Sequence, residues 1–276
     1  MFLNYIIWEV SPEIFSIGSF GVRWYSLFFA TGIFLSYLFM SKIYKKEGLN
    51  LELLDKLSVY VVLGIILGAR LGHCLFYETS YYLNHPLEIF LPWRGSIFGD
   101  DFNFTGFRGL ASHGAVIGIL TSLFLYTRKY KIDYLWILDR LVIVSALSGA
   151  FVRLGNLMNS EIVGKKTDFI FAFIFKRIDE IPRHPAQVYE SICYFIIFIG
   201  LYFYFKKYYK NFSKGNIFSF FLIFVFLTRF ILEFFKENQE VFEESLFINM
   251  GQILSIPFIL IGISIFIRNK FMKNLN

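Results

Sequence analysis

The sequence IFSFFLIFVFLTRF at residues 217–230 decides the fold class. It contains one charged residue, Arg229, and its apolar side chains follow one another without alternation. Such a continuous run is typical of a membrane-spanning helix, whereas a strand of a membrane β-barrel alternates apolar and polar residues over about ten positions. A second run of this kind occupies residues 192–205. The two runs therefore predict a helical membrane protein.

Further segments on both sides of this stretch are also long and apolar enough to span a bilayer, at about 20 residues each. The composition agrees, because 17% of the 276 residues are charged, whereas soluble domains have about 25%. We predict an all-α integral membrane protein with seven transmembrane helices in one polytopic domain, residues 1–276. The predicted spans are residues 20–41, 57–77, 110–127, 134–155, 188–205, 216–236 and 250–268.

Lysine and arginine concentrate in one set of connections. The linkers after the first, third and fifth predicted spans, with the segment from Arg268 onward, hold 14 of them, and the longer opposite connections hold 7. The positive-inside rule then places the N-terminus outside and the C-terminus in the cytoplasm. The net charge of +6 thus reflects topology and not a nucleic-acid partner. Two long connections, about 78–109 and 158–187, fall outside, where we predict that they form a small external head.

Polar side chains are costly inside membrane spans, so each one is a candidate functional residue. Every predicted span contributes some, and most lie near its predicted outer end. They include Tyr25, Arg70, His73, His113, Arg153, Asn156, Asn159, Glu161, His184, Gln187, Glu190, Arg229, Glu233 and Gln252. Groups that only hold helices together would be spread over all depths, so the shared level predicts one outward-facing site. Asp139 and Arg140 are expected to pair inside the bundle.

Seven motifs resemble the signatures of the prolipoprotein diacylglyceryl transferase family, in the same order and with suitable spacing. The longest is RLGNLMNSEIVG at residues 153–164. The others are GVRWY (21–25), GARLG (68–72), HG (113–114), RHPAQVYE (183–190), RFILEFF (229–235) and MGQILS (250–255). The resemblance covers residues 10–268. It departs from the family pattern at Ser26, Ala115 and Ser160, where glycine is usual, and these small-residue exchanges affect fine packing.

The resemblance implies a transferase of the bacterial inner membrane that catalyses the first step of lipoprotein maturation. The diacylglyceryl group of phosphatidylglycerol would pass to the lipobox cysteine of a prolipoprotein signal peptide, forming a thioether and releasing glycerol 1-phosphate. The active site would face outward. No covalent enzyme intermediate is required, because the nucleophile belongs to the substrate, and no cofactor is expected, because the sequence has no phosphate-binding glycine loop and no cysteine cluster. No metal is expected either, because the histidines and cysteines lack metal-ligand spacing, and no nucleic acid is implied.

The donor lipid carries a phosphodiester, and the guanidinium fork of arginine suits its anionic oxygens. The resemblance assigns Arg153 to the phosphatidylglycerol head group, although an arginine near a span end can also be a topology anchor that extends to the interface. Arg229 is the second catalytic candidate. Its alternative interpretation is an i,i+4 ion pair with Glu233, which is compatible with a catalytic role.

The acceptor is a thiol that attacks as the thiolate, so its proton needs an acceptor. His113 is the candidate base because imidazole titrates near neutral pH. It is also suited to capping the helix that it opens or to binding the lipid head group. Tyr25 is expected to contact the phosphate or a glycerol hydroxyl, with an aromatic residue of the membrane interface as the alternative.

The remaining site residues have orienting or supporting roles. Asn156, Asn159 and Glu161 are expected to orient the head group and the arginines, and Gly164 to permit close backbone approach. The predicted supporting residues are Arg70, His184, Gln187, Glu233 and Gln252.

Two other classes of membrane protein compete with the enzyme. A secondary transporter needs polar groups accessible from both faces, and the inner halves of these spans are nearly free of charge. A receptor or scaffold does not need two arginines and a histidine at one level. Turnover of phosphatidylglycerol with a lipobox peptide separates the enzyme from both.

Overall fold

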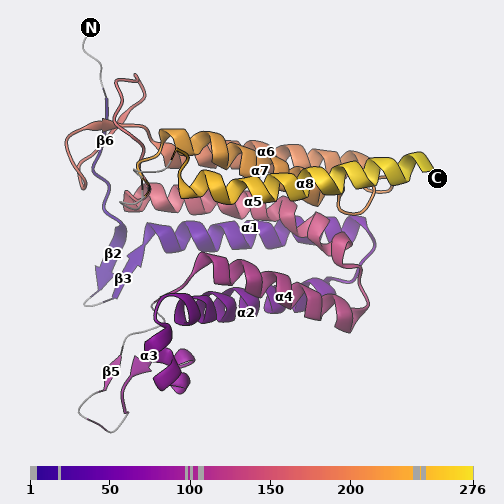
Figure 1. The fold of residues 1–276 in the computed structure, drawn as a ribbon, viewed down its shortest axis with the longest axis horizontal. Helices are drawn as coiled ribbons and strands as arrows, with labels where there is room; N and C mark the ends of the chain where they lie inside the picture. Colours follow the sequence, from indigo (N-terminus) through magenta and orange to yellow (C-terminus); the bar gives the residue numbers. More distant parts are fainter. Residues whose placement is uncertain are drawn as a thin grey trace. The chain divides into compact units, whose positions relative to one another are not determined.

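A computed structural model describes residues 5–17, 20–96, 99, 102–104, 109–238, 243 and 247–275, and most of them are helical (Figure 1). The α-helices are α1 (Trp24–Lys46), α2 (Leu51–Phe76), α3 (Thr79–Asn84), α4 (Ser112–Tyr130), α5 (Tyr134–Asn159), α6 (Ala186–Tyr208), α7 (Asn216–Leu232) and α8 (Met250–Leu275). The short 3-10 helices are η1 (Pro86–Ile89) and η2 (Glu233–Phe235). The strands are β1 (Ile6–Trp8), β2 (Glu13–Ile17), β3 (Phe20–Arg23), β4 (Trp93–Arg94), β5 (Asn103–Phe104), β6 (Phe173–Phe175) and β7 (Pro182–Arg183).

Within these described ranges, six helices are long and apolar enough to cross a membrane: α1, α2, α5, α6, α7 together with η2, and α8. Large apolar side chains such as Phe34, Leu63 and Ile196 are 61%, 51% and 62% exposed on them, as expected of surfaces that lipid covers. The molecule is therefore a multi-helix membrane protein. The predicted span at 110–127 is also a helix, α4, but its glycines and polar residues keep it outside this group of six.

The helices continue past their predicted ends where lysines occur. α1 extends to Lys46, and α6 passes Lys206 before it ends at Tyr208. The long lysine stem carries its ammonium away from the apolar surface, so the charge does not terminate the helix. α5 also continues past its predicted end at residue 155, and it ends at Asn159, inside the signature at 153–164.

Three small sheets were not predicted. β6 pairs in parallel with β1 and antiparallel with β7, while β2 with β3 and β4 with β5 form antiparallel pairs. The strands have two to five residues, too few for a pattern of alternation to be recognised. Through β1, the N-terminal segment becomes part of the loop at 158–187.

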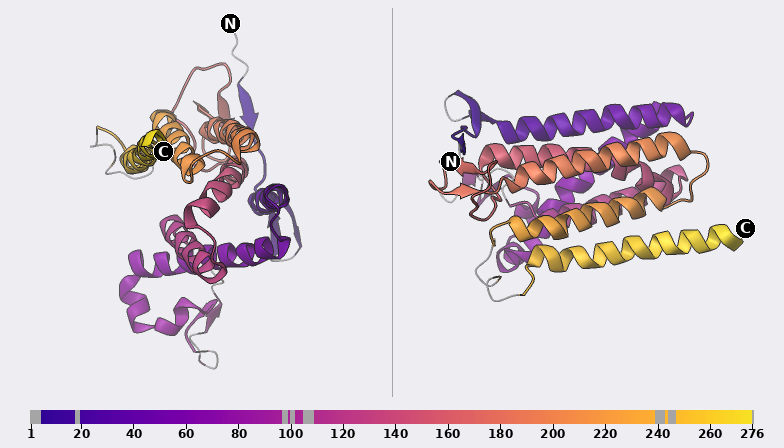
Figure 2. Two further views of the ribbon diagram at one scale, coloured as in Figure 1. Left: turned by 90° about the vertical axis from the view of Figure 1, so that its right-hand side faces the viewer. Right: turned by 90° about the horizontal axis from the view of Figure 1, so that it is seen from above.

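The contacts divide the chain into two compact units, Met1–Ile43 with Leu138–Asn276, and Tyr44–Ile137. In the first unit, α7 and α8 lie side by side along their length (Figures 1 and 2). The β1–β6–β7 sheet lies at the end of this unit where α6 begins (Figure 1). The sheet, the signature end of α5 and the junction of α7 with η2 are therefore neighbours in space.

A buried carboxylate fixes the start of α7 in the first unit. Asp139 is 0% exposed, and its two oxygens accept hydrogen bonds from the backbone NH groups of Gly215 at 2.7 Å and Phe218 at 2.8 Å. Such a carboxylate satisfies amides that a helix N-terminus leaves unpaired. The predicted pair with Arg140 is present at 4.0 Å.

In the second unit, α2 and α4 pack along a seam of small residues. The seam brings Gly64, Gly68 and Gly72 of α2 against Ser122, Gly118 and Gly114 of α4. A methyl group at Gly118 would lie 2.0 Å from the carbonyl oxygen of Gly64, and one at Gly68 would lie 2.4 Å from that of Gly114. Small residues at every fourth position let helix backbones approach closely in membranes. The order of the pairs makes the two helices antiparallel.

The connection after α2 is folded in its described part. Glu88 accepts a hydrogen bond from the Tyr81 hydroxyl at 2.7 Å and one from the backbone NH of Gly95 at 3.0 Å. The bond to Glu88 raises the pKa of Tyr81 to about 12. Arg94 forms an ion pair with Glu78 nearby. These contacts join α3, η1 and β4 into one small subdomain.

Candidate functional site

The signature end of α5 forms a chain of polar contacts. Arg153 and Asn156 lie one helical turn apart, and Arg153 Nη1 donates to Asn156 Oδ1 at 3.3 Å. The amide nitrogens of Asn156 and Asn159 each donate to one oxygen of Glu161, at 3.0 and 3.1 Å. Both carboxylate oxygens of Glu161 are thus held, and the two asparagines connect that carboxylate to the arginine. The residues predicted to orient the arginine do contact it or each other.

The backbone reverses direction immediately after α5. Ser160 and Ile162 have φ values of 54° and 56°, in the left-handed region that glycine tolerates best. A β-branched residue there is a strained outlier, and such strain often accompanies functional sites. The reversal turns Glu161 back toward α5, where Asn156 and Asn159 reach its carboxylate.

Gly164 allows three segments of backbone to meet. A methyl group at this position would lie 2.4 Å from the carbonyl oxygen of His184 and 2.7 Å from that of Phe235. The Gly164 NH donates to the His184 carbonyl at 2.9 Å, and the Lys165 NH donates to the Phe235 carbonyl at 2.8 Å. The close approach predicted at Gly164 is thus made by the protein's own backbone, which ties the signature loop to α6 and η2.

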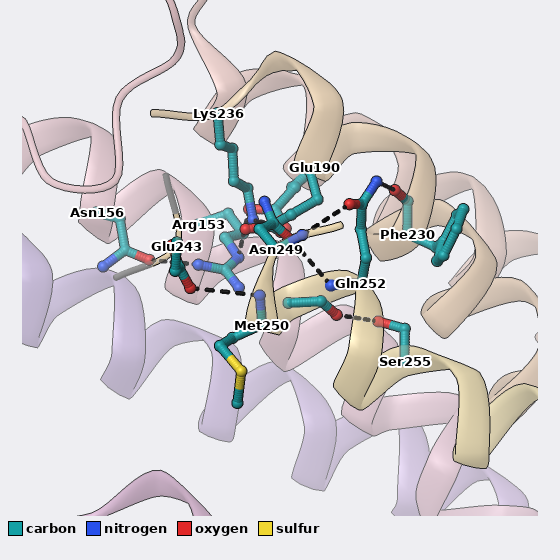
Figure 3. A network of polar contacts seen from close by, with 12 residues as sticks. Arg153, Asn156, Glu190, Phe230, Lys236, Glu243, Asn249, Met250, Gln252 and Ser255 are labelled. Atoms are coloured by element: carbon teal, nitrogen blue, oxygen red, sulfur yellow. Dashed lines mark hydrogen bonds and ion pairs between the residues drawn. The ribbon is translucent and has the colours of Figure 1, made fainter. Parts of the chain in front are cut away.

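Arg153 begins a row of four charged side chains of alternating sign, and Figure 3 shows the first three, Arg153, Glu190 and Lys236. Arg153 Nε lies 2.9 Å from Oε2 of Glu190, which is 0% exposed. The other oxygen of Glu190 accepts from Lys236 Nζ at 3.0 Å, and the same ammonium donates to Glu233 at 3.0 Å. Lys236 is only 2% exposed. The network places a fixed, partly buried guanidinium at the centre of the first unit's polar cluster.

Arg229 is the cation of this cluster whose Nε atom is buried without a hydrogen-bond partner. The alternative pair with Glu233 is not formed, since that carboxylate bonds to Lys236 instead. No ion pair to Arg229 occurs among the described residues. The buried phenol of Tyr194 lies within electrostatic range of both Arg153 and Arg229. The charges of two arginines, one of them with an unused donor, therefore both act on this phenol.

The start of α8 is locked against the end of α7. The side chains of Asn249 and Gln252 each accept a hydrogen bond from the other's backbone NH, at 3.0 and 3.1 Å. This reciprocal arrangement is a capping box. Gln252 Nε2 also donates to the Phe230 carbonyl at 3.3 Å. A methyl group at Gly251 would lie 2.5 Å from the carboxyl carbon of Glu233. Gln252 thus joins the start of α8 to the residue that follows Arg229, and Gly251 leaves room for the carboxylate of Glu233.

Three further predicted residues lie in the same unit. The Tyr25 ring covers Gly155, where a methyl group would lie 2.8 Å from it, and the charges of Glu161 and Arg153 act on its hydroxyl. Gln187 Nε2 donates to the Glu161 carbonyl at 2.5 Å. His184 Nδ1 lies 3.2 Å from the Tyr189 hydroxyl, and burial lowers the pKa of His184.

Arg70 and His113 belong to the second unit. Arg70 is buried and donates to the carbonyls of Ile89 at 2.9 Å and Glu88 at 3.0 Å, so it holds η1 against the end of α2. His113 is the second residue of α4 and is exposed, while its neighbour Gly114 is buried in the seam with α2.

Sequence reasoning missed Lys236 and Tyr194, and it gave Glu190 no role. Lys236 falls three residues after Glu233, a spacing that brings two side chains to one helical face, and this signal could have indicated the pair. Nothing comparable indicated Tyr194. No cluster of three potential metal ligands occurs in the described part of the chain.

The chain is similar to known proteins over nearly its whole length. A family model described as prolipoprotein diacylglyceryl transferase matches residues 12–268. Proteins named phosphatidylglycerol–prolipoprotein diacylglyceryl transferase are 46% identical over 258 residues in Bacteroides fragilis (94% of this chain, 93% of the relative) and 44% over 259 residues in Tolumonas auensis (94% and 95%). One in Rickettsia felis is 34% identical over 258 residues (92% and 95%).

Proposed function

Since the chain belongs to the prolipoprotein diacylglyceryl transferase family, we propose that it transfers the diacylglyceryl group of phosphatidylglycerol to the lipobox cysteine of prolipoproteins. This is the first step of bacterial lipoprotein maturation. The observation that supports the assignment to a site is the pair of arginines in the first unit, Arg153 in an ion pair with the buried Glu190 and Arg229 with a buried, unpartnered Nε donor.

The transfer is a displacement at the glycerol carbon that bears the phosphate. The substrate sulfur forms a bond to this carbon, the carbon–oxygen bond breaks, and its electron pair leaves with glycerol 1-phosphate. The thiol proton passes to a base. Negative charge grows on the departing phosphate, so preorganised cations at that position stabilise the transition state.

Arg153 and Arg229 supply those cations. Arg153 forms an ion pair with Glu190 at 2.9 Å and a hydrogen bond to Asn156 at 3.3 Å, and these two contacts hold its guanidinium in place before the donor binds. Arg229 brings a donor that the described residues do not use. Asn156, Asn159 and Glu161 keep this arrangement in place, and Tyr25 contributes a hydroxyl beside it. Preorganised arginine forks bind phosphate more specifically than a point charge does.

His113 is the proposed base. Its exposed position at the start of α4 suits an exchange of protons with a substrate thiol. Binding of the lipid head group by His113 remains the alternative role, and a variant described in the Discussion separates the two.

The proposed topology has seven spans, with the N-terminus outside, the C-terminus in the cytoplasm, and the connections 78–109 and 158–187 forming an external head. α4 supplies the remaining span. It packs antiparallel against α2 from Gly72 to Gly64, and a helix that follows a membrane span so closely shares its depth. At 19 residues and 1.5 Å per residue, α4 is about 28 Å long, close to the thickness of the bilayer core. The site then faces outward from the bacterial inner membrane.

The test is turnover by the purified protein in vesicles of labelled phosphatidylglycerol with a lipobox peptide. We expect the peptide to gain one diacylglyceryl group for each glycerol 1-phosphate released. Arg153→Ala should abolish the transfer, and so should Arg153→Lys, because an ammonium cannot replace the bidentate fork. Absence of product from the folded wild-type protein would instead favour a transporter or a receptor.

A further inference from the structure

Lys236 is the most deeply buried cation of the polar cluster, at 2% exposure. Its ammonium lies 3.0 Å from Glu190 and 3.0 Å from Glu233 (Figure 3). Burial of a charged ammonium is costly unless the group is paired and hydrogen-bonded. An apolar side chain would fill this volume without the cost of burying a charge. The presence of a lysine here therefore indicates that its charge has a role.

Glu190 is shared between two cations, with one oxygen for each. Oε1 bonds to Lys236, and Oε2 contacts Arg153 through Nε. Another nitrogen of the Arg153 guanidinium, Nη1, donates to Asn156. If Glu190 lost Lys236, both of its oxygens would be available to the arginine, and a bidentate pair is the geometry that a carboxylate and a guanidinium prefer. The arginine would then turn toward Glu190.

The backbone around Lys236 keeps the ammonium in register with the signature loop. The Lys165 NH donates to the Phe235 carbonyl at 2.8 Å, and the Glu237 NH donates to the Val163 carbonyl at 3.3 Å. Residues on both sides of Lys236 are thus bonded to the loop that contains Gly164. The same loop holds Glu161, which reaches Arg153 through Asn156.

We propose that Lys236 is a positioning residue for the donor phosphate, because it occupies one oxygen of Glu190 and so keeps the Arg153 guanidinium turned toward the lipid head group. Lys236 does not touch the lipid itself. This role rests on the proposed transfer from phosphatidylglycerol to a cysteine, and it adds a second structural element, η2, to the signature that orients the arginine.

The experiment compares Lys236→Met, Lys236→Arg and Lys165→Met in the phosphatidylglycerol and lipobox-peptide assay. We expect Lys236→Met to lower kcat/KM for phosphatidylglycerol by about 100-fold, the effect of a small misplacement of a binding group, with the KM for the peptide unchanged. Lys236→Arg should retain most of the activity, because its fork can still reach both carboxylates. Lys165→Met removes an exposed lysine of the same region and should behave like the wild type.

A second comparison separates positioning from simple charge balance. Lys236→Met leaves the buried carboxylates of Glu190 and Glu233 without the ammonium that they share, which lowers thermal stability, and adding Glu233→Gln removes one of those charges. We expect the double variant to regain stability relative to Lys236→Met while its kcat/KM for phosphatidylglycerol stays far below that of Glu233→Gln alone. If Lys236→Met fails to fold, the double variant carries the test.

Two results would overturn the proposal: wild-type kcat/KM in Lys236→Met, or a double variant that regains activity together with stability. Both are distinct from failure of the proposed function, in which the wild-type protein itself forms no lipidated peptide.

Discussion

Ser160 has two features that destabilise the folded protein. The sequence shows only that serine stands where the resembled family pattern has glycine. Its φ is 54°, and its hydroxyl is buried without a hydrogen-bond partner. A left-handed backbone costs a non-glycine residue about 1–2 kcal/mol, and an unpaired buried hydroxyl adds to that cost. The glycine that is usual at this position has neither penalty.

Ser160→Gly is therefore expected to stabilise the protein. The gain is about 0.5–1 kcal/mol, because the greater flexibility of glycine in the unfolded chain offsets part of the relief. Thermal unfolding in detergent measures it, with Ser160→Ala as the control. Alanine removes the hydroxyl and keeps the backbone strain, so a larger gain in alanine than in glycine would show that the backbone of residue 160 is not strained.

His113 is the second prediction at the scale of a residue. A substrate thiol with a pKa of about 8.5 is mostly protonated at neutral pH. If His113 is the base, His113→Gln should lose most of the rate, still bind phosphatidylglycerol, and recover partly as the pH is raised, because more thiolate then forms without help. Measurements of phosphatidylglycerol binding and of the transfer rate as a function of pH distinguish a base from a ligand of the head group. Weak donor binding with no recovery at high pH would assign His113 to the head group instead.

Among the elements, the seam between α2 and α4 depends on glycines, and only three of them, Gly68, Gly72 and Gly114, belong to motifs that resemble the family. Gly118→Ala is expected to destabilise the protein by about 1–3 kcal/mol, because its methyl group would meet the Gly64 backbone at 2.0 Å and backbone cannot move aside as a side chain can. The unfolding temperature measures this loss.

The matched control for the seam is Gly200→Ala in α6, where nothing lies within 4 Å of the added methyl group. In that open position alanine is the better helix former by about 1 kcal/mol, so its effect should have the opposite sign. Equal effects at the two positions would contradict the close packing of α2 on α4.

For the whole molecule, the number of spans fixes the side on which each loop lies. With seven spans, a reporter near Asp168 and one near Asp100, which is outside the described residues, lie on the same outer side, and a reporter after Phe271 lies in the cytoplasm. If α4 did not cross the membrane, the reporters at Asp100 and Asp168 would lie on opposite sides. Cysteine accessibility or enzyme-fusion reporters at the three positions therefore count the spans directly.

The sequence by itself determined the helical membrane class, six spans to within a few residues, the family, and most of the residues in the polar cluster. These features are encoded locally, because a bilayer requires long apolar runs and a signature keeps its spacing along the chain. The run at 217–230 and the signature at 153–164 needed no partner to be recognised.

Only the tertiary structure decided which polar groups contact one another. Glu233 bonds to Lys236 and leaves Arg229 with an unused donor, although the i,i+4 spacing favoured the opposite pairing. Lys236 reaches Glu190 across 46 residues of sequence, and β1 joins β6 from the far N-terminus. Such pairings depend on the docking of segments far apart in the chain, because burial favours arrangements in which charges are paired and hydrogen-bonded. A local sequence pattern therefore does not predict which charged groups pair with one another.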